Sequence, residues 1–347
     1  MKADFPFGEP ANLGPAINCA LDDSGASLSA DGLSLFFDCD YPNGSDWDLE
    51  GQWDLFVASR QTLEDDWGLP VNLGPAVNRA DGSEGDASLS ADGLELYFTR
   101  GSRTQRQDIH HDLYVTTRET TNDEWAPAVN LGEWINTPAN EGSASISADG
   151  LSLYFASDRE GGQGGKDLYV TTRSTRNDVW CSPINLGAAI NSSDDDFAPG
   201  IASDGLTLIF SSTRPGKHSR YSDLWMARRT TTSDTWSEPF NLGPIVNTDD
   251  VHYADLSPDG RTLYLTCLNR QGGFGDYDLW QASIIPIVDL NGDGIVDSSD
   301  MSIMVDHWGQ DYPLCDIGPT PWGDGIVDVR DLIVLAEHLF EPFPLAQ

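Results

Sequence analysis

One sequence unit occurs five times in this chain of 347 residues, and this repeat restricts the possible folds more than any other feature. Each copy contains an Asp-Gly turn, whose glycine falls at positions 32, 93, 150, 205 and 260. Consecutive glycines are therefore separated by 61, 57, 55 and 55 residues. This period is longer than that of helical solenoid repeats, and it predicts five similar modules packed beside one another.

The third copy, residues 143–187, shows the unit most clearly. Its segments SASIS and LSLYFAS flank the Ala-Asp-Gly turn, which is typical of a β-hairpin because Asp-Gly accepts positive φ angles. The segment DLYVTTR is rich in β-branched and aromatic residues and predicts a third strand. A fourth strand is predicted at P-I-N-L-G. Four strands per unit, repeated radially, make a β-propeller.

The phrase that ends each unit also occurs at the start of the chain. FGEPANLG at 7–14 matches WGLPVNLG at 67–74, WAPAVNLG at 125–132, WCSPINLG at 180–187 and WSEPFNLG at 236–243. The fifth unit lacks this phrase after its third strand. We therefore expect the N-terminal strand to complete the fifth blade, since an open ring would expose sheet edges. The expected fold is an all-β, five-bladed propeller of four-stranded antiparallel blades over residues 1–287.

The pattern S-A-D-G-L-x-L-Y-F followed by DLYVTTR resembles the PD40, or WD40-like, propeller repeat of the TolB type. The resemblance covers residues 6 to about 287. It implies a binding platform or scaffold outside the cytoplasm, joined to other domains.

The segment DLNGDGIVDSSD at 289–300 matches a calcium-binding loop. Calcium takes six to eight oxygen ligands, and the loop offers them at the expected spacing. The predicted ligands are Asp289, Asn291, Asp293, the Ile295 carbonyl, Asp297 and Asp300. A solvated acidic turn is the alternative.

A second loop at 323–331 departs from the template in its first half. Its predicted ligands are Asp324, Asp328 and Asp331, with Asp316 as the first ligand if the intervening residues form an insertion. A metal-free loop is the alternative here. Each loop precedes a helical pattern, with apolar residues at Met301, Met304, Val305 and Trp308 and at Leu332, Leu335, Ala336 and Leu339.

The two loop–helix motifs resemble a type I dockerin over roughly residues 286–342. The resemblance implies a small α-helical, EF-hand-like domain at 288–342, with 343–347 as a tail. It also implies calcium as the cofactor and a cohesin-like or cell-surface protein as the partner. Docking of this module on the propeller itself is the alternative.

The chain has 56 acidic and 19 basic residues, a formal net charge of −37. Such a surface repels phosphate backbones, which excludes nucleic acid and anionic membranes as expected partners. No stretch of 18 apolar residues predicts a membrane span, and no signal peptide is visible in MKADFPFGEP. We expect a secreted or cell-surface bacterial monomer. Cys19 and Cys39 lie in one repeat and can pair, although five cysteines leave at least one thiol over.

An acidic residue stands nine positions before the turn glycine in four units. The set is Asp23, Glu84, Glu141 and Asp196, and in the fifth unit His252 lies beside the corresponding Val251. These residues can ring the channel mouth and bind a ligand. Alternatively, each carboxylate fixes its own turn through backbone N–H groups, and the repetition of the residue favours this second interpretation.

Loops that differ between units are the other candidates for function. They are DCDYPNGSDWDLEGQW at 38–53, RTQRQDIHH at 103–111 and RPGKHSRY at 214–221. Aromatic and acidic residues together suit sugar binding, although ordinary exposed loops have the same composition.

No catalytic motif is visible, so no catalytic residue is assigned. The expected function is a secreted, non-catalytic propeller that binds a protein or a glycan and is attached through its calcium module. The alternative is a carbohydrate-active enzyme, a glycoside hydrolase or polysaccharide lyase, that acts in polysaccharide degradation and is targeted by its dockerin.

Overall fold

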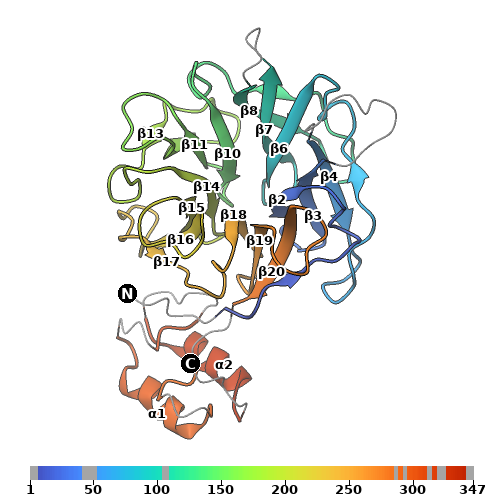
Figure 1. Ribbon diagram of the computed structural model, residues 1–347. Coiled ribbons are helices and arrows are strands. Elements are labelled where there is room, and N and C mark those ends of the chain that lie inside the picture. The colour runs from blue at the N-terminus through green and yellow to red at the C-terminus, as the bar shows by residue number, and fades with distance from the viewer. Residues whose placement is uncertain are drawn as a thin grey trace.

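A computed structural model of the chain describes residues 7–40, 53–103, 109–284, 288–291, 295–310, 315–318 and 326–340. Five four-stranded antiparallel sheets surround a central channel, and a small helical part lies beside the ring (Figure 1). The expected five-bladed propeller is confirmed. Neither of the described helices is long and apolar enough to cross a membrane.

Four blades are each formed by one continuous stretch of chain, with the first strand innermost (Figure 1). Blade 1 consists of β2 (Asp23–Leu28), β3 (Ser34–Cys39), β4 (Asp54–Ser59) and β5 (Val71–Asn72). Blade 2 consists of β6 (Gly82–Leu89), β7 (Glu95–Arg103), β8 (Ile109–Thr117) and β9 (Val129–Asn130). Blade 3 consists of β10 (Glu141–Ile146), β11 (Ser152–Ser157), β12 (Asp167–Thr172) and β13 (Ile184–Asn185). Blade 4 consists of β14 (Asp196–Ile201), β15 (Thr207–Ser212), β16 (Asp223–Arg228) and β17 (Phe240–Asn241).

Blade 5 joins the two ends of the propeller sequence. It consists of β18 (Asp250–Leu256), β19 (Thr262–Leu268), β20 (Tyr277–Ser283) and β1 (Ala11–Asn12). β1 pairs antiparallel with β20, and Phe7 forms a further bridge with Ile284. Phe7 is buried in the core of blade 5. The predicted closure by the N-terminal strand is therefore confirmed.

Two asparagines explain why the N-L-G phrase is repeated. In blade 3 and the following turn, Asn185 Oδ1 accepts hydrogen bonds from Gly187 N and from Asn191 Nδ2. Asn191 in turn accepts from Leu168 N and donates to Leu168 O, at 2.8 and 3.0 Å. The same pattern occurs at Asn18, Asn78, Asn136 and Asn247. The asparagine pair thus satisfies the N–H of Leu168 and adds a second hydrogen bond to its C=O, which also accepts from Leu186 N, and this stabilises the outer edge of the blade.

The repeated tryptophans are held by arginines. Arg60, Arg118, Arg173 and Arg229 each lie over a tryptophan ring, at 4.2 to 4.4 Å from its centroid. Each of these arginines also donates to the carbonyl of the turn glycine in its own blade. The contact thus ties the outer loop to the hairpin turn through a cation–π interaction. In blade 5 the apolar pair Phe7 and Ile284 takes the place of tryptophan and arginine.

The C-terminal part contains two nine-residue helices among the described residues, α1 (Ser298–Asp306) and α2 (Val329–Glu337). Asp297 and Asp328 cap their N-termini in capping boxes. Both helices contribute to one apolar core with residues from the loops that precede them, Met304 and Leu335 being fully buried. A separate α-helical domain of the dockerin type is not shown by two helices of this length.

The predicted apolar stripes on these helices were only partly correct. Val305 and Trp308 are about half exposed, and Ala336 is exposed as well. α1 ends at its C-cap His307, so Trp308 lies beyond the helix and does not follow the helical period.

Candidate functional site

The innermost strand of every blade contains one residue in the left-handed conformation, seven positions before the turn glycine. A β-bulge interrupts the pairing of the inner strand at this point in each blade. The five residues are Gly25, Asp86, Ser143, Ala198 and Tyr253, with φ between 45° and 65°. All five line a narrow cavity of about 40 Å³ between the inner strands. The bulge thus presents one residue per blade to the cavity, and all of these residues except Gly25 have a side chain.

The chemistry of this ring differs from blade to blade, although its backbone conformation repeats. The residue six positions after the turn glycine also differs in chemistry from blade to blade. It is Asp38 in blade 1 and Thr99 in blade 2, followed by Ala156, Ser211 and Thr266. Of the ten residues at these two positions, only Asp38 of blade 1 and Asp86 of blade 2 are acidic.

A larger cavity of about 290 Å³ lies where blades 1, 2 and 5 meet. Its acidic lining residues are Asp38 and Asp86. Its ring-bearing lining residues are Trp53, His111, His252, Tyr253 and Tyr277. No lysine or arginine is among the described residues that line it. The cavity therefore combines flat apolar faces with carboxyl groups.

Asp38 and Asp86 are held in different environments. Asp38 is 3% exposed, and its Oδ1 accepts a hydrogen bond from Asp86 N at 2.9 Å. Burial raises the pKa of Asp38 well above its usual range, and the charge of Asp86 raises it further. Asp86 Oδ2 instead accepts from Thr99 Oγ1, Ser143 Oγ and Ser143 N at 2.9, 3.1 and 3.2 Å. The two carboxyl groups therefore differ in their hydrogen-bond partners: Asp38 accepts from one backbone N–H, whereas Asp86 accepts from two hydroxyl groups and one backbone N–H.

The remaining titratable groups of the cavity are neutral at neutral pH. Burial lowers the pKa of His111 and of His252. Burial raises the pKa of Tyr253 well above its usual range, and the charge of Asp86 adds to this effect. His252 lies edge-on to Tyr277, with ring centroids 5.6 Å apart. The wall of the cavity is therefore built from uncharged rings.

The four carboxylates nine positions before the turn glycine lie at the start of the inner strands, and all are fully buried. Three of them contact an arginine of the same blade. These pairs are Glu84 with Arg100, Glu141 with Arg159 and Asp196 with Arg214, at 2.6, 3.1 and 2.5 Å. Each carboxylate also accepts a backbone N–H from the preceding loop. None of the four lines either cavity, whereas His252 lines the larger one.

The loops that break the repeat contribute to the cavity at their edges. Asp38 and Trp53 delimit the first of these loops, and His111 ends the second. Tyr41, Trp47 and Arg106 lie outside the described residues. The third loop does not line the cavity: its Lys217 Nζ donates to the carbonyls of Arg220 and Tyr221.

Sequence reasoning missed Asp38 and Asp86 as a pair. Both stand at positions that can be aligned in all five units, and both differ there from the other units. A comparison of these two aligned positions across the five units would have identified both residues from the sequence.

The first acidic loop of the C-terminal part closes on itself. Asp300 is fully buried, and its Oδ1 accepts from Leu290 N and Asn291 N at 2.7 and 3.1 Å. Its Oδ2 accepts from Asp297 N at 2.8 Å. Asp289, the residue before Leu290, is also buried, with 6% of its surface exposed. Two buried carboxylates, Asp289 and Asp300, thus belong to one loop, and carboxylate oxygens are ligands that suit a hard cation such as calcium. Asp293 lies outside the described residues, and Ile295 is half exposed.

The second loop has the same arrangement. Asp331 Oδ1 accepts from Ile317 N and Gly318 N at 2.6 and 2.7 Å, and its Oδ2 accepts from Asp328 N. Asp316 therefore occupies the position that Asp289 has in the first loop, despite the longer sequence between them. Asp324 lies outside the described residues.

No protein-family model matches this chain, and no curated protein matches it. Several solved structures share its fold. An α-L-arabinofuranosidase from Lactobacillus brevis has a TM-score of 0.52 at 13% identity, covering 79% of this chain and 94% of that one. An α-L-arabinofuranosidase from Podospora anserina, in complex with cellotriose, has 0.51 at 12%, covering 81% and 98%. The catalytic domain of a GH62 α-L-arabinofuranosidase from Coprinopsis cinerea has 0.51 at 11%, covering 80% and 97%.

These matches correct one expectation from the sequence. The expectation of a non-catalytic binding propeller is contradicted, because several solved structures that share the fold are α-L-arabinofuranosidases. The resemblance to the PD40 repeat is confirmed only as far as the five-bladed propeller fold.

Proposed function

We propose that the chain is a glycoside hydrolase whose active site is the cavity between blades 1, 2 and 5. One observation carries the proposal: Asp38 and Asp86 share this cavity, at positions where the repeat is broken, and burial holds the pKa of Asp38 well above its usual range. Hydrolysis of a glycosidic bond by two carboxyl groups needs one of them protonated and the other ionised. The fold shared with arabinofuranosidases supports this function by analogy.

In this mechanism Asp38 is the general acid. Burial and the neighbouring Asp86 keep its proton at neutral pH, and the proton passes to the leaving oxygen of the substrate. Asp86 is the second carboxyl group of the reaction and is held in place by hydrogen bonds from Thr99 and Ser143. It activates water or stabilises the positive charge that develops on the sugar ring.

The walls of the cavity favour a neutral sugar. Trp53, Tyr253 and Tyr277 offer the flat faces on which sugar rings pack. Two carboxyl groups, without a lysine or arginine among the described lining residues, would repel the carboxylate of a uronic acid. A volume of about 290 Å³ lies at the lower end of small-molecule sites, which span roughly 300–1,000 Å³. We therefore expect a terminal or side-chain sugar, with arabinofuranosides as the first substrates to test.

The test is release of reducing sugar from a panel of neutral oligosaccharides and polysaccharides. Asp38→Asn and Asp86→Asn should each lower kcat/KM about 100-fold or more. Asp178→Asn is the matched control, because Asp178 closes an exposed turn of blade 3 by accepting from Thr175 Oγ1. Full activity in both cavity variants would refute the assignment. An unsaturated product, detected by its ultraviolet absorbance, would identify a lyase instead.

A second part of the proposal concerns residues 288–342, which we assign to a calcium-binding module of the dockerin type. Asp289, Asn291, Asp297, Asp300 and the Ile295 carbonyl would hold one ion. Asp316, Asp328 and Asp331 would hold a second. The gathering of buried carboxylates in both loops supports this assignment. The ion would order the module for a cohesin-like or cell-surface partner, which suits a secreted monomer whose propeller ends at 287.

A further inference from the structure

The start of the inner strand is built differently in blade 1 than in blades 2, 3 and 4. In those three blades a fully buried carboxylate is neutralised by an arginine. Asp23 of blade 1 has the same position and is equally buried, yet no arginine or lysine contacts it among the described residues. Blade 5 has no buried carboxylate at this position, because its residue there is Val251. A buried carboxylate without a counter-charge is costly, so Asp23 must either hold a proton or be neutralised by another cation.

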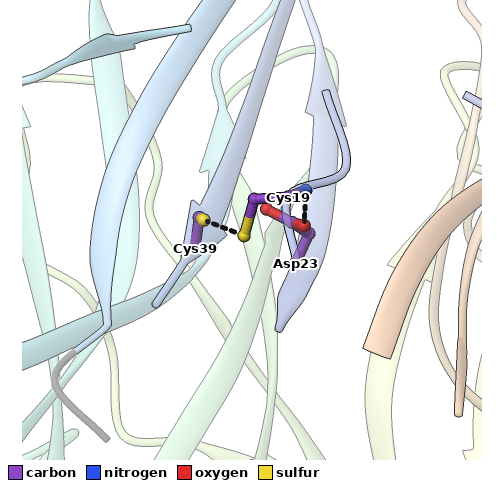
Figure 2. A group of neighbouring side chains, drawn as sticks. All are labelled: Cys19, Asp23 and Cys39. Carbon is purple, nitrogen blue, oxygen red and sulfur yellow. Dashed lines mark hydrogen bonds between the residues drawn. The ribbon is translucent and has the colours of Figure 1, made fainter. Parts of the chain in front are cut away.

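Two cysteines surround Asp23 in place of the arginine. Cys39 lies directly opposite Asp23 in the β2–β3 pairing, as Arg100 lies opposite Glu84 in blade 2. Cys19 N donates to Asp23 Oδ2 at 2.6 Å, and the sulfur atoms of Cys19 and Cys39 are 3.4 Å apart. Figure 2 shows the three side chains converging from the loop before β2, from β2 and from β3.

The distances among these side chains suit one metal ion. One ligand atom from each of the three residues lies within 4.8 Å of the other two. Two sulfurs bound to zinc in a tetrahedron are separated by roughly 3.8 Å, from a Zn–S distance of about 2.3 Å. Asp23 Oδ1 is buried and accepts no hydrogen bond from the described part of the chain, so one carboxylate oxygen is available. Cys19 is partly exposed, which gives an ion access.

We propose that Cys19, Asp23 and Cys39 bind a zinc ion, which takes the place of the arginine found in blades 2, 3 and 4. Two thiolates and one carboxylate select zinc over calcium and magnesium, which prefer oxygen ligands alone. Without a metal ion the cluster holds protons: burial raises the pKa of Asp23 to about 8, and the hydrogen bond with Cys19 together with burial raises the pKa of Cys39 well above its usual range, whereas the hydrogen bond with Cys39 lowers the pKa of Cys19 to about 7. Zinc displaces these protons, so binding strengthens as the pH rises.

Zinc at this point would also stabilise the catalytic cavity. Cys39 follows Asp38 directly in β3, and Asp38 lines the cavity. The ion would fix the end of the strand that presents Asp38. A disulfide between the two cysteines would tie the same strand but would leave the Asp23 carboxylate without a counter-charge.

The test is titration of the reduced, metal-free full chain with Co²⁺ and then Zn²⁺, with calcium in excess to saturate the C-terminal loops. We expect one equivalent of Co²⁺ to give a thiolate charge-transfer band, which Zn²⁺ removes by displacement. Cys19→Ser and Cys39→Ser should abolish the band, and Asp23→Asn should weaken binding at least tenfold. The exposed Cys181 supplies the matched control, Cys181→Ser, which should bind like the wild type.

The wild-type titration decides the proposal even if a variant does not fold. Absence of a charge-transfer band in the wild type would overturn it. Peptide mapping that finds a Cys19–Cys39 disulfide in the protein as purified, without reductant, would overturn it as well. Loss of the band in Cys181→Ser would assign the metal to a different cysteine.

Discussion

Asp38 Oδ1 accepts the backbone N–H of Asp86 at 2.9 Å, across the boundary between blades 1 and 2. Asp38 belongs to β3, the second strand of blade 1, and Asp86 belongs to β6, the innermost strand of blade 2. The packing of these two blades therefore sets the distance between the two residues. The charge of Asp86 also contributes to the raised pKa of Asp38. The two carboxyl groups are therefore coupled both in position and in ionisation.

Ser143→Ala should lower kcat/KM about fivefold. Ser143 Oγ donates to Asp86 Oδ2 at 3.1 Å, and the variant removes this hydrogen bond, which holds the Asp86 carboxyl group in place. A loss of about 1 kcal/mol corresponds to a factor of roughly five in rate. Alanine is tolerated in this conformation, since Ala198 adopts it in blade 4. Steady-state kinetics measure the effect, and Thr175→Val, in an exposed turn, is the control. Unchanged kinetics in Ser143→Ala would separate the position of Asp86 from the reaction.

Asp255→Asn should raise the thermal stability at pH 8 but not at pH 4. Burial raises the pKa of Asp255 to about 7, whereas an unfolded aspartate titrates near about 3.9. The folded state therefore holds a proton that the unfolded state has lost between these values. Stability is at its full value below pH 4 and falls as the pH rises towards 7. Calorimetry at both pH values measures the difference. Equal gains at pH 4 and pH 8 would contradict the linkage.

Asn191→Ala should destabilise the propeller by about 2 kcal/mol, because it leaves the buried N–H of Leu168 without a partner, whereas Leu168 O still accepts from Leu186 N. Urea denaturation measures the effect. Asn122→Ala removes an exposed side chain of the same type and should change stability little. Similar midpoints for the two variants would mean that water replaces the lost hydrogen bonds.

Deletion of residues 1–14 should destabilise the whole ring, because it removes β1 and leaves the edge of β20 unpaired. The single change Phe7→Ala should cost about 3 kcal/mol or more, since Phe7 is buried in the core of blade 5. Leu69→Ala is the control, because Leu69 is 81% exposed. If the truncated chain melts like the full chain, the closure by β1 does not contribute to stability.

Removal of calcium should lower the melting temperature of the C-terminal part and leave that of the propeller unchanged. Asp289→Ala should have the same effect without chelator, because it removes a buried carboxylate of the first loop. Differential scanning calorimetry resolves the two transitions. Identical melting profiles with calcium and with chelator would exclude calcium binding by these loops.

The sequence predicted the fold because each recurring residue has a local role that repeats with the unit. Asn185 and Asn191, for example, satisfy the same backbone groups as their counterparts in the other blades. The position of the N-terminal strand followed from the phrase that the fifth unit lacks.

The candidate site was less predictable because its geometry depends on a bulge. Strict alternation along an inner strand gives Glu84 and Asp86 the same orientation. The bulge places Asp86 in the left-handed conformation at the channel, while Glu84 pairs with Arg100 at the start of the strand. Periodicity contains no information on where a strand departs from its regular form. The proximity of Asp38 to Asp86 depends in addition on contacts between blades, which no single unit encodes.

The pairing of β1 with β20 also sets the order of events during synthesis on the ribosome. Blades 1 to 4 each come from one continuous stretch, so their strands can pair soon after they emerge. Blade 5 forms later, because Ala11 and Asn12 are made before the other four blades and their partners Gln281 and Trp280 are made after them. Throughout translation of the ring, Phe7 and the strand that follows it remain without their partner. Ring closure is therefore the slowest contact to form, and the nascent chain is most exposed to aggregation just before it occurs.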